Sequence, residues 1–176
     1  MLQPLEESKA AAIPARQFLF DTWFCSPVSL LRIHRLGYEV VTMAKKTEKT
    51  HLLHEGVMQD VKEIYKKYQK RRGRSKYLLS VEATVRKGDE SIPLRFVFVR
   101  NRNNRKDWLV LVTTDIFLTE EEVIRIYGKR WKIDVFFKVC KSYLRLEKDC
   151  RSLSYDAMTA HVSIVFTRHM FFVVEH

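Results

Sequence analysis

The chain has 176 residues, of which 46% are hydrophobic and 12% aromatic, a composition typical of one globular domain rather than of a disordered chain. No run approaches the roughly 18 uninterrupted apolar residues of a membrane span. The first residues lack the basic and apolar regions of a secretory signal. We therefore expect a cytoplasmic protein without membrane association. The formal net charge of +11 favours a polyanionic partner such as nucleic acid.

The cysteines and histidines do not indicate a disulfide framework or a zinc site. Cys25, Cys140 and Cys150 are an odd number without CxxC spacing, so we expect free thiols. The nearest histidine pair, His51 and His54, lies in a polar stretch and lacks the spacing of metal ligands.

The first predicted elements form a strand, a helix and a second strand. Residues 17–21, QFLFD, are an apolar run that ends on an acid; Ser26 followed by proline is typical of a helix start, and Gly37 of a helix end. The β-branched stretch YEVVTMA follows. A βαβ unit normally has parallel strands, so Asp21 would lie at the carboxyl end of its strand, where open α/β sheets bind ligands. Asp21 would equally suit capping of the next loop.

A basic segment follows this unit. Residues 61–76 carry eight Lys and Arg residues against one glutamate, which suits nucleic acid and equally a solvated surface. We expect a helical piece up to about residue 72, then a β-hairpin of YLLSVEATV and IPLRFVFVR around the turn KGDES. The whole stretch, about 45–107, is predicted as a β-rich basic insertion. Its candidate DNA-binding residues are Arg71, Arg72, Arg74, Arg102 and Arg105.

The rest of the chain is predicted to be mainly helical. The strand WLVLVTT leads to Asp115, which we interpret as a turn residue rather than as a metal ligand. Thr119 and Glu122 form a capping box that starts a helix. A second or continuing helix is expected up to about Leu146, and a last helix from Ser154 onward.

The stretch YGKRWKIDVFFKVCK places one acid among cations and apolar residues. On a single helix of about 100° per residue, its polar side chains fall on one stripe within roughly 60°, and the apolar ones predict that the other faces are buried. The stripe consists of Tyr127, Arg130, Asp134 and Lys141, bordered by Lys138. A metal and phosphate site needs such a mixture. Ordinary i,i+4 ion pairs, Arg130 with Asp134 and Asp134 with Lys138, explain it as well.

This stretch resembles the Tyr-x2-Arg-x3-Glu-x6-Lys signature of bacterial insertion-sequence DDE transposases, which cut and rejoin DNA with a ribonuclease H-like catalytic domain. Tyr127, Arg130, Asp134 and Lys141 keep its spacing, with Asp where the family has its third catalytic Glu. FLFDTWF resembles the segment around the family's second catalytic Asp, which maps to Asp21. Other similar segments, among them LGYEVVTMAKK and FVFVRNRNNRKDWL, extend the resemblance from about residue 13 onward.

The resemblance implies a fold, an activity and a site. It implies an α/β chain with a partial ribonuclease H-like fold, a βαβ unit plus C-terminal helices, over 17–176 after a polar leader at 1–16. It further implies that Asp21 and Asp134 are catalytic ligands of Mg²⁺ or Mn²⁺, and that Tyr127, Arg130, Lys138 and Lys141 bind DNA. The implied partner is transposon-end DNA at the bacterial nucleoid, and full-length relatives are possible homodimers.

Two departures from the family pattern bear on activity. No strand is predicted before Gln17 to carry the family's first catalytic Asp, so we expect the C-terminal part of a transposase, catalytically incomplete alone, whose Asp21 strand lies at an open sheet edge. Asp134 is one methylene shorter than Glu, which would displace a metal ligand by about 1 Å. The alternative is a non-catalytic basic module that binds nucleic acid.

Overall fold

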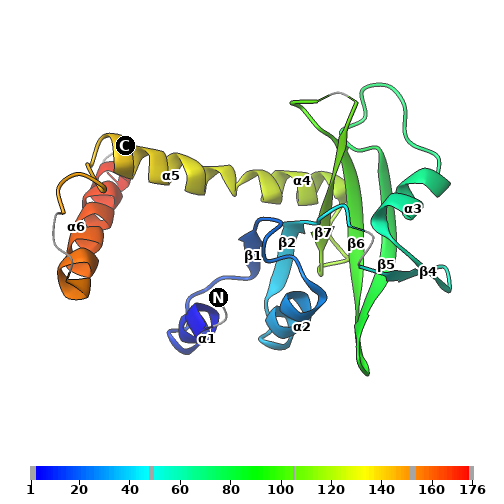
Figure 1. Cartoon of the computed structure of the whole chain (residues 1–176), viewed down its shortest axis with the longest axis horizontal. Coiled ribbons are helices and arrows are strands. Elements are labelled where there is room, and N and C mark those ends of the chain that lie inside the picture. Colours follow the sequence, from blue (N-terminus) through cyan, green and yellow to red (C-terminus); the bar gives the residue numbers. More distant parts are fainter. Residues whose placement is uncertain (1–2, 48–49, 105, 151–153, 175–176) are drawn as a thin grey trace. The chain divides into compact units, whose positions relative to one another are not determined.

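The computed structural model describes residues 3–47, 50–104, 106–150 and 154–174. It divides the chain into two units, Met1–Gly128 and Lys129–His176, and each is described by itself. The elements are drawn in Figure 1. None of the described helices is long and apolar enough to cross a membrane.

The first unit is built on one mixed sheet, which within the described residues has seven strands in the order β1-β2-β7-β6-β5-β3-β4. Neighbouring strands β1 and β2 are parallel, and the remaining pairs are antiparallel. The fold class predicted from the sequence, α/β with a βαβ unit, is confirmed. The strands are β1 Gln17–Phe20, β2 Glu39–Met43, β3 Leu52–His54, β4 Val57–Gln59, β5 Leu79–Lys87, β6 Glu90–Arg100 and β7 Trp108–Thr113.

Local signals explain the βαβ unit. Helix α2, Pro27–Arg35, begins after Ser26, whose Oγ accepts a hydrogen bond from the Ser29 N–H at 3.2 Å. The chain leaves the helix through Gly37 with φ +81°, a left-handed conformation that glycine adopts without a steric penalty. Strand β1 lies at one edge of the sheet, as predicted for the strand that ends before Asp21.

Helices cover both faces of the sheet. On one face α2 and α3, Val61–Lys67, pack on Val40 and Phe98, and on the other face α4, Glu120–Gly128, packs on Val41. Val40 and Val41, successive residues of β2, therefore point into cores on opposite faces of the sheet, and both side chains are fully buried. Burial on both faces accounts for the continuous apolar runs of these central strands.

The predicted basic insertion is continuous with this sheet. Strands β5 and β6 pair antiparallel as expected, around the turn at Gly88 and Asp89. Strand β7 pairs with β6 on one side and with β2 on the other, so the hairpin and the βαβ unit share one sheet.

The helical piece expected up to about residue 72 is largely wrong. Helix α3 is confined to Val61–Lys67, and the short hairpin β3–β4 precedes it. Its turn residues Glu55 and Gly56 have φ values of 50° and 78°, as a two-residue hairpin turn requires. In the predicted polar leader, α1 (Gln3–Ala10) buries Leu5 in the core.

The second unit consists of α5, Trp131–Ser142, and α6, Tyr155–Val174. They pack through a small cluster that contains Phe136, Cys140 and Val165. The last helix was predicted at this position, whereas α5 ends before the expected limit near Leu146. The expected burial around α5 is also wrong: Trp131 and Val135 are exposed, because the contact with α6 uses one stripe of the helix.

Candidate functional site

Asp21 follows directly on β1, at the carboxyl end of the parallel strand pair. The main chain there is anchored by the Thr42 hydroxyl, which donates to the Phe20 carbonyl at 2.9 Å and approaches the Asp21 carbonyl at 3.3 Å. The Asp21 carboxylate accepts the Trp23 N–H at 2.9 Å. The side chain is half-buried. The predicted position of Asp21 at the carboxyl end of β1 is confirmed, and its carboxylate also closes the following turn; its role as a metal ligand stays a prediction.

Asp115 follows the internal strand β7 and lies at the opposite end of the strands from Asp21. Strand β7 runs antiparallel to β2, and the Thr114 N–H donates to the Val40 carbonyl at 3.2 Å, near the start of β2. The buried Asp115 carboxylate accepts the Phe117 N–H at 3.2 Å and lies 3.5 Å from the Arg16 guanidinium. Asp115 is thus a turn residue, as the sequence indicated, and it is remote from the strand end that carries Asp21.

The predicted polar stripe does not lie on one helix. Tyr127 belongs to α4, which ends at Gly128, and it packs against the core of the first unit. Asp134 and Lys138 lie on α5, which begins at Trp131. Gly128 explains the interruption, since glycine costs about 1 kcal/mol relative to alanine inside a helix. The stripe argument therefore applies only to the residues of the second unit.

Within the second unit, Asp134 has a cationic neighbour. The Arg130 guanidinium donates to its carboxylate at 3.1 Å, and the Asp134 side chain is 46% exposed. The ordinary i,i+4 ion pair is therefore formed. In the described residues the second possible pair, between Asp134 and Lys138, is not formed, and the Lys141 ammonium lies 2.6 Å from Glu147. Arg130 and Lys141 are thus each paired with an acid of the same unit.

Asp21 belongs to the first unit and Asp134 to the second, so their convergence on one ion stays a prediction. Within the described part of the chain, no three Asp, Glu, His or Cys side chains gather into a metal-holding group. The two carboxylates nevertheless have the donor chemistry that suits Mg²⁺, which is usually bound by one or two carboxylates together with water and substrate phosphates. The residues present fit such an ion chemically.

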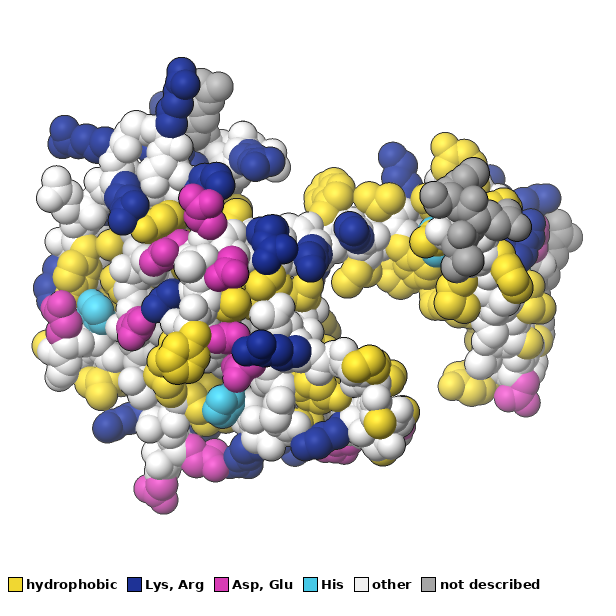
Figure 2. All heavy atoms as spheres, turned by 180° about the vertical axis from the view of Figure 1, so that it is seen from behind, with side chains coloured by type: hydrophobic (Ala, Val, Ile, Leu, Met, Phe, Trp, Pro, Cys, Tyr) yellow, Lys and Arg dark blue, Asp and Glu magenta, His cyan; other side chains and the backbone are white. Residues whose placement is uncertain are grey.

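A basic groove lies at one end of the first unit, in an open concave surface. It is lined by Lys66, Lys67, Lys70, Arg71, Arg72 and Arg100. Figure 2 shows lysine and arginine side chains gathered at the upper end of this unit, and the loops from α3 to β5 and from β6 to β7 lie there in Figure 1. Of the predicted DNA-binding residues, Arg71 and Arg72 line the groove, Arg74 and Arg102 do not, and Arg105 lies outside the described residues.

The groove is held in shape by hydrogen bonds and aromatic rings. Arg100, which was not among the predicted DNA-binding residues, donates to the carbonyls of Gly73 and Ser75 at 2.8 and 3.4 Å and so ties the loop to the end of β6. The Arg71 guanidinium lies 4.4 Å from the centroid of the Tyr77 ring. The sequence signal for Arg100 was its place among the basic residues at the end of a long predicted strand.

Part of the groove's charge is available to a ligand. Lys67 lies 3.4 Å from the Glu55 carboxylate, and the hydrogen bond from Tyr68, followed by that from Lys67, lowers the pKa of Glu55. Among the described residues, the side chains of the groove residues Lys66 and Arg72, and of Arg74 beside the groove, form no hydrogen bond or ion pair. Unpaired, exposed cations are the groups that can neutralise phosphates without first giving up an internal partner.

A comparison with protein families identifies the family of the chain. A family model described as a transposase DDE domain matches residues 3–171, which reach into both units. A comparison with curated proteins finds no match. Domains of the matched family act on DNA and typically use divalent metal ions. The chain therefore belongs to the transposase DDE domain family, with a function related to DNA transposition.

Proposed function

We propose that the chain contributes to metal-dependent cleavage and transfer of DNA strands, with Asp21 and Asp134 as the metal ligands. The observation that carries this proposal is the position of Asp21. In a chain of the DDE family, it is the carboxylate that directly follows a strand of the parallel pair. This is where α/β sheets place ligands. The spacing of Tyr127, Arg130, Asp134 and Lys141 supports the second ligand and the signature subtype.

Each proposed ligand has neighbours that suit its role. A divalent ion, when bound, would polarise the scissile phosphate and activate the attacking hydroxyl or water. Thr42 fixes the main chain at Asp21 by hydrogen bonding to the Phe20 carbonyl at 2.9 Å, so the carboxylate is carried on a rigid strand end. Arg130 balances the charge of Asp134 at 3.1 Å, and a guanidinium can instead contact two oxygens of a phosphate.

DNA is held, in this proposal, by cations outside the metal ligands. Arg130, Lys138 and Lys141 of the second unit would contact phosphates near the cut end. The basic groove, with Arg74 and Arg102 beside it, would contact the backbone farther along the duplex. Such contacts position the protein but do not read the sequence. The family signature has three acids and two are assigned here, so we infer that the chain alone binds DNA and needs a further acid to cut it.

A second candidate function is DNA binding without catalysis. The unpaired cations Lys66, Arg72 and Arg74 favour it, because they would bind phosphates whether or not a metal is present. Binding and cleavage can be measured separately. Binding is followed by fluorescence anisotropy of a labelled duplex without metal, and cleavage by nicking of supercoiled plasmid with Mg²⁺ or Mn²⁺.

The variants Asp21→Asn and Asp134→Asn separate the two functions, with Asp89→Asn, an exposed turn acid, as the matched control. We expect both site variants to bind DNA as well as the unmodified chain or better, and to lose any metal-dependent nicking. Asp134→Glu, which restores the family residue, should retain any nicking that the unmodified chain shows. Loss of metal-free affinity in Asp21→Asn would contradict the site assignment. Since the chain alone is expected to bind rather than to cut, metal decides: affinity that Mg²⁺ raises in the unmodified chain but not in Asp21→Asn or Asp134→Asn would support the first function. Equal affinity with and without Mg²⁺ in every form would support the second.

A further inference from the structure

The turn that follows Asp21 presents a tryptophan to solvent. Trp23 is 79% exposed, and its N–H donates to the Asp21 carboxylate at 2.9 Å. Farther along the turn, the Ser26 N–H donates to the Phe24 carbonyl at 3.0 Å, and the Phe24 ring meets the buried Phe20 ring edge-on at 6.5 Å between centroids. The backbone is thus fixed on both sides of Trp23, so the indole is held out beside the proposed metal ligand.

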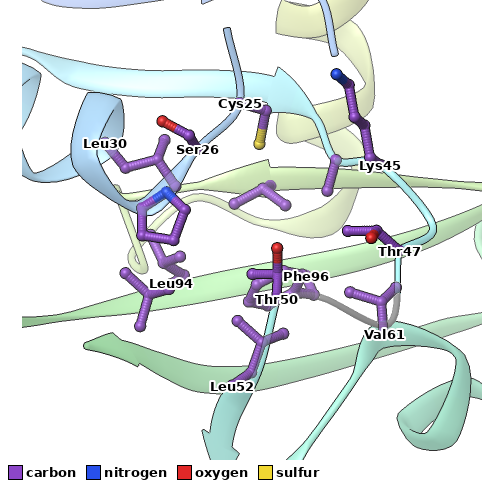
Figure 3. A pocket seen from close by; sticks show the side chains of 14 residues that line it. Cys25, Ser26, Leu30, Lys45, Thr47, Thr50, Leu52, Val61, Leu94 and Phe96 are labelled. Carbon is purple, nitrogen blue, oxygen red and sulfur yellow. The ribbon is translucent and has the colours of Figure 1, made fainter. Parts of the chain in front are cut away.

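A cation lies over this indole. The Lys45 ammonium is 4.9 Å from the centroid of the Trp23 ring, within the range of a cation–π interaction. Lys45 follows β2, the parallel partner of β1, so it stands at the same carboxyl end of the strand pair as Asp21. In Figure 3 the Lys45 ammonium points away from the neighbouring pocket. Among the described residues, Lys45 forms no ion pair with an acid, so its charge is available to a ligand.

The turn after Asp115 has the same backbone hydrogen bond without the cation. The Phe117 N–H donates to the Asp115 carboxylate at 3.2 Å, and Phe117 is 90% exposed. No Lys or Arg of the described residues lies over the Phe117 ring, and the Asp115 carboxylate itself faces the Arg16 guanidinium at 3.5 Å. What distinguishes Trp23 is therefore the accompanying cation, and Phe117 serves as its matched control.

An exposed aromatic ring beside a cation suits a nucleotide that is not base-paired. Proteins that bind single strands stack the bases on aromatic side chains and hold the phosphates with cations. Inside a duplex, the faces of each base are covered by the neighbouring base pairs, whereas an unpaired nucleotide has a face free to stack. Because Lys45 lies over one face of the indole, the other face is left for the base.

We propose that Trp23 and Lys45 form a binding site for one unpaired nucleotide of the DNA, with its base stacked on the indole and a phosphate at the Lys45 ammonium. The proposal rests on the proposed function, because that function brings a DNA end to Asp21. The site adds a contact with a base to the phosphate contacts of the basic groove, and so holds the strand end beside the metal ligand. It reads no particular base, since every base has a face that can stack.

Fluorescence anisotropy of three labelled duplexes in EDTA tests the site without metal. One duplex is blunt, one has a single-stranded thymidine overhang, and one has an overhang of abasic nucleotides, which keeps the phosphates and removes the bases. Overhangs of both strand polarities are compared. We expect the unmodified chain to bind the thymidine overhang of one polarity about 5- to 150-fold more tightly than the abasic overhang, the range typical of one base–aromatic stack.

Four variants assign this preference to the site. Trp23→Ala should bind the thymidine and abasic overhangs with equal affinity, and its affinity for the blunt duplex should stay unchanged. Trp23→Phe, which keeps an aromatic ring, should retain part of the preference, and Phe117→Ala should retain all of it. For the overhang duplex, Lys45→Gln should lower the slope of log affinity against log salt concentration by about 0.7, the contribution of one phosphate of a single strand. The two overhangs are compared within each variant, so a loss of stability does not imitate a loss of stacking.

A photo-cross-link locates the base independently. Iodouracil in the overhang, irradiated in the complex, should join to Trp23, and mass spectrometry of the peptides identifies the residue. The proposal is overturned if the unmodified chain does not prefer thymidine over abasic overhangs, if Trp23→Ala keeps the preference, if Phe117→Ala loses it equally, or if the cross-link forms at another aromatic residue instead. Failure of the proposed function would appear elsewhere, as DNA affinity that does not respond to Mg²⁺, and these metal-free measurements do not depend on it.

Discussion

Replacing Lys66, Arg72 and Arg74 by glutamine should weaken DNA binding at low salt. It should also make the DNA affinity less dependent on salt concentration. The three side chains are exposed, and none forms an ion pair within the described structure. Their loss therefore breaks no internal contact, and exposed substitutions of this kind usually change the free energy of unfolding by less than about 0.5 kcal/mol. A change in binding can then be assigned to the lost charges.

The magnitude follows from counterion release. Each phosphate contact contributes about 0.9 to the slope of log affinity against log salt concentration on duplex DNA. Three contacts contribute about 2.7. Between 0.05 and 0.2 M salt, the unmodified chain should therefore lose roughly 40-fold more affinity than the triple variant.

The assay is fluorescence anisotropy of a labelled duplex across this salt range. The control variant replaces Arg32, Arg86 and Lys87 by glutamine, which removes the same charge. Arg86 and Lys87 are exposed at the hairpin end of β5, whereas the groove residue Arg100 ends β6 at the other end of the pair. An equal change in the salt slope of both variants would mean that net charge acts without a defined groove. An unchanged salt slope in the variant of Lys66, Arg72 and Arg74 would refute the groove assignment.

Three further predictions concern stability. Asp60 caps α3 by accepting the Lys62 and Glu63 N–H groups at 2.7 and 2.9 Å, so Asp60→Ala should lower the free energy of unfolding in urea by about 1–2 kcal/mol, and Asp60→Ser by less. Gly37→Ala, at φ +81°, should cost about 1–2 kcal/mol, seen as a lower Tm. A hydrogen bond from Lys46 holds the pKa of Asp107 at about 2, below its ordinary 3.8. The unfolded chain therefore binds an extra proton between these two values, and the free energy of unfolding falls as the pH decreases through them. Asp107→Asn should reduce this loss when unfolding is measured from pH 5 to pH 2.

The elements that the sequence predicted best are those with local signals at both ends. Ser26 and Gly37 bound α2, and the turn KGDES joins β5 to β6. The capping box at Thr119 is formed, with the Glu122 carboxylate accepting the Thr119 N–H at 2.9 Å. Each of these signals acts within a few residues, so no knowledge of the tertiary fold is needed to recognise it.

The elements that were missed depend on contacts distant in sequence or on weak signals. The three-residue strands β3 and β4 are too short to show an alternating pattern, and the neighbouring lysines favoured a helix. Leu5 is buried in α1 by contacts that its polar neighbours do not indicate. The break between α4 and α5 had a signal in Gly128, which the polar stripe outweighed.

The candidate site was predictable in part for the same reason. The place of Asp21 follows from the order of strand, helix and strand, and its structure agrees. The role of Arg100 in the groove was not predictable, because it depends on the antiparallel register that brings Phe98 beside Leu79, near the basic loop. The pairing of Asp21 with Asp134 joins two units and stays a prediction.

The most direct test of the proposed site is whether these two aspartates hold the same ion. Fe²⁺ is added in place of Mg²⁺, together with duplex DNA and ascorbate, and generates radicals that cut the protein backbone beside the bound ion. Mass spectrometry of the protein fragments locates the cuts. We predict cuts near both Asp21 and Asp134, and the loss of both cuts in Asp21→Asn and equally in Asp134→Asn. A cut near Asp134 that persists in Asp21→Asn would contradict the shared site.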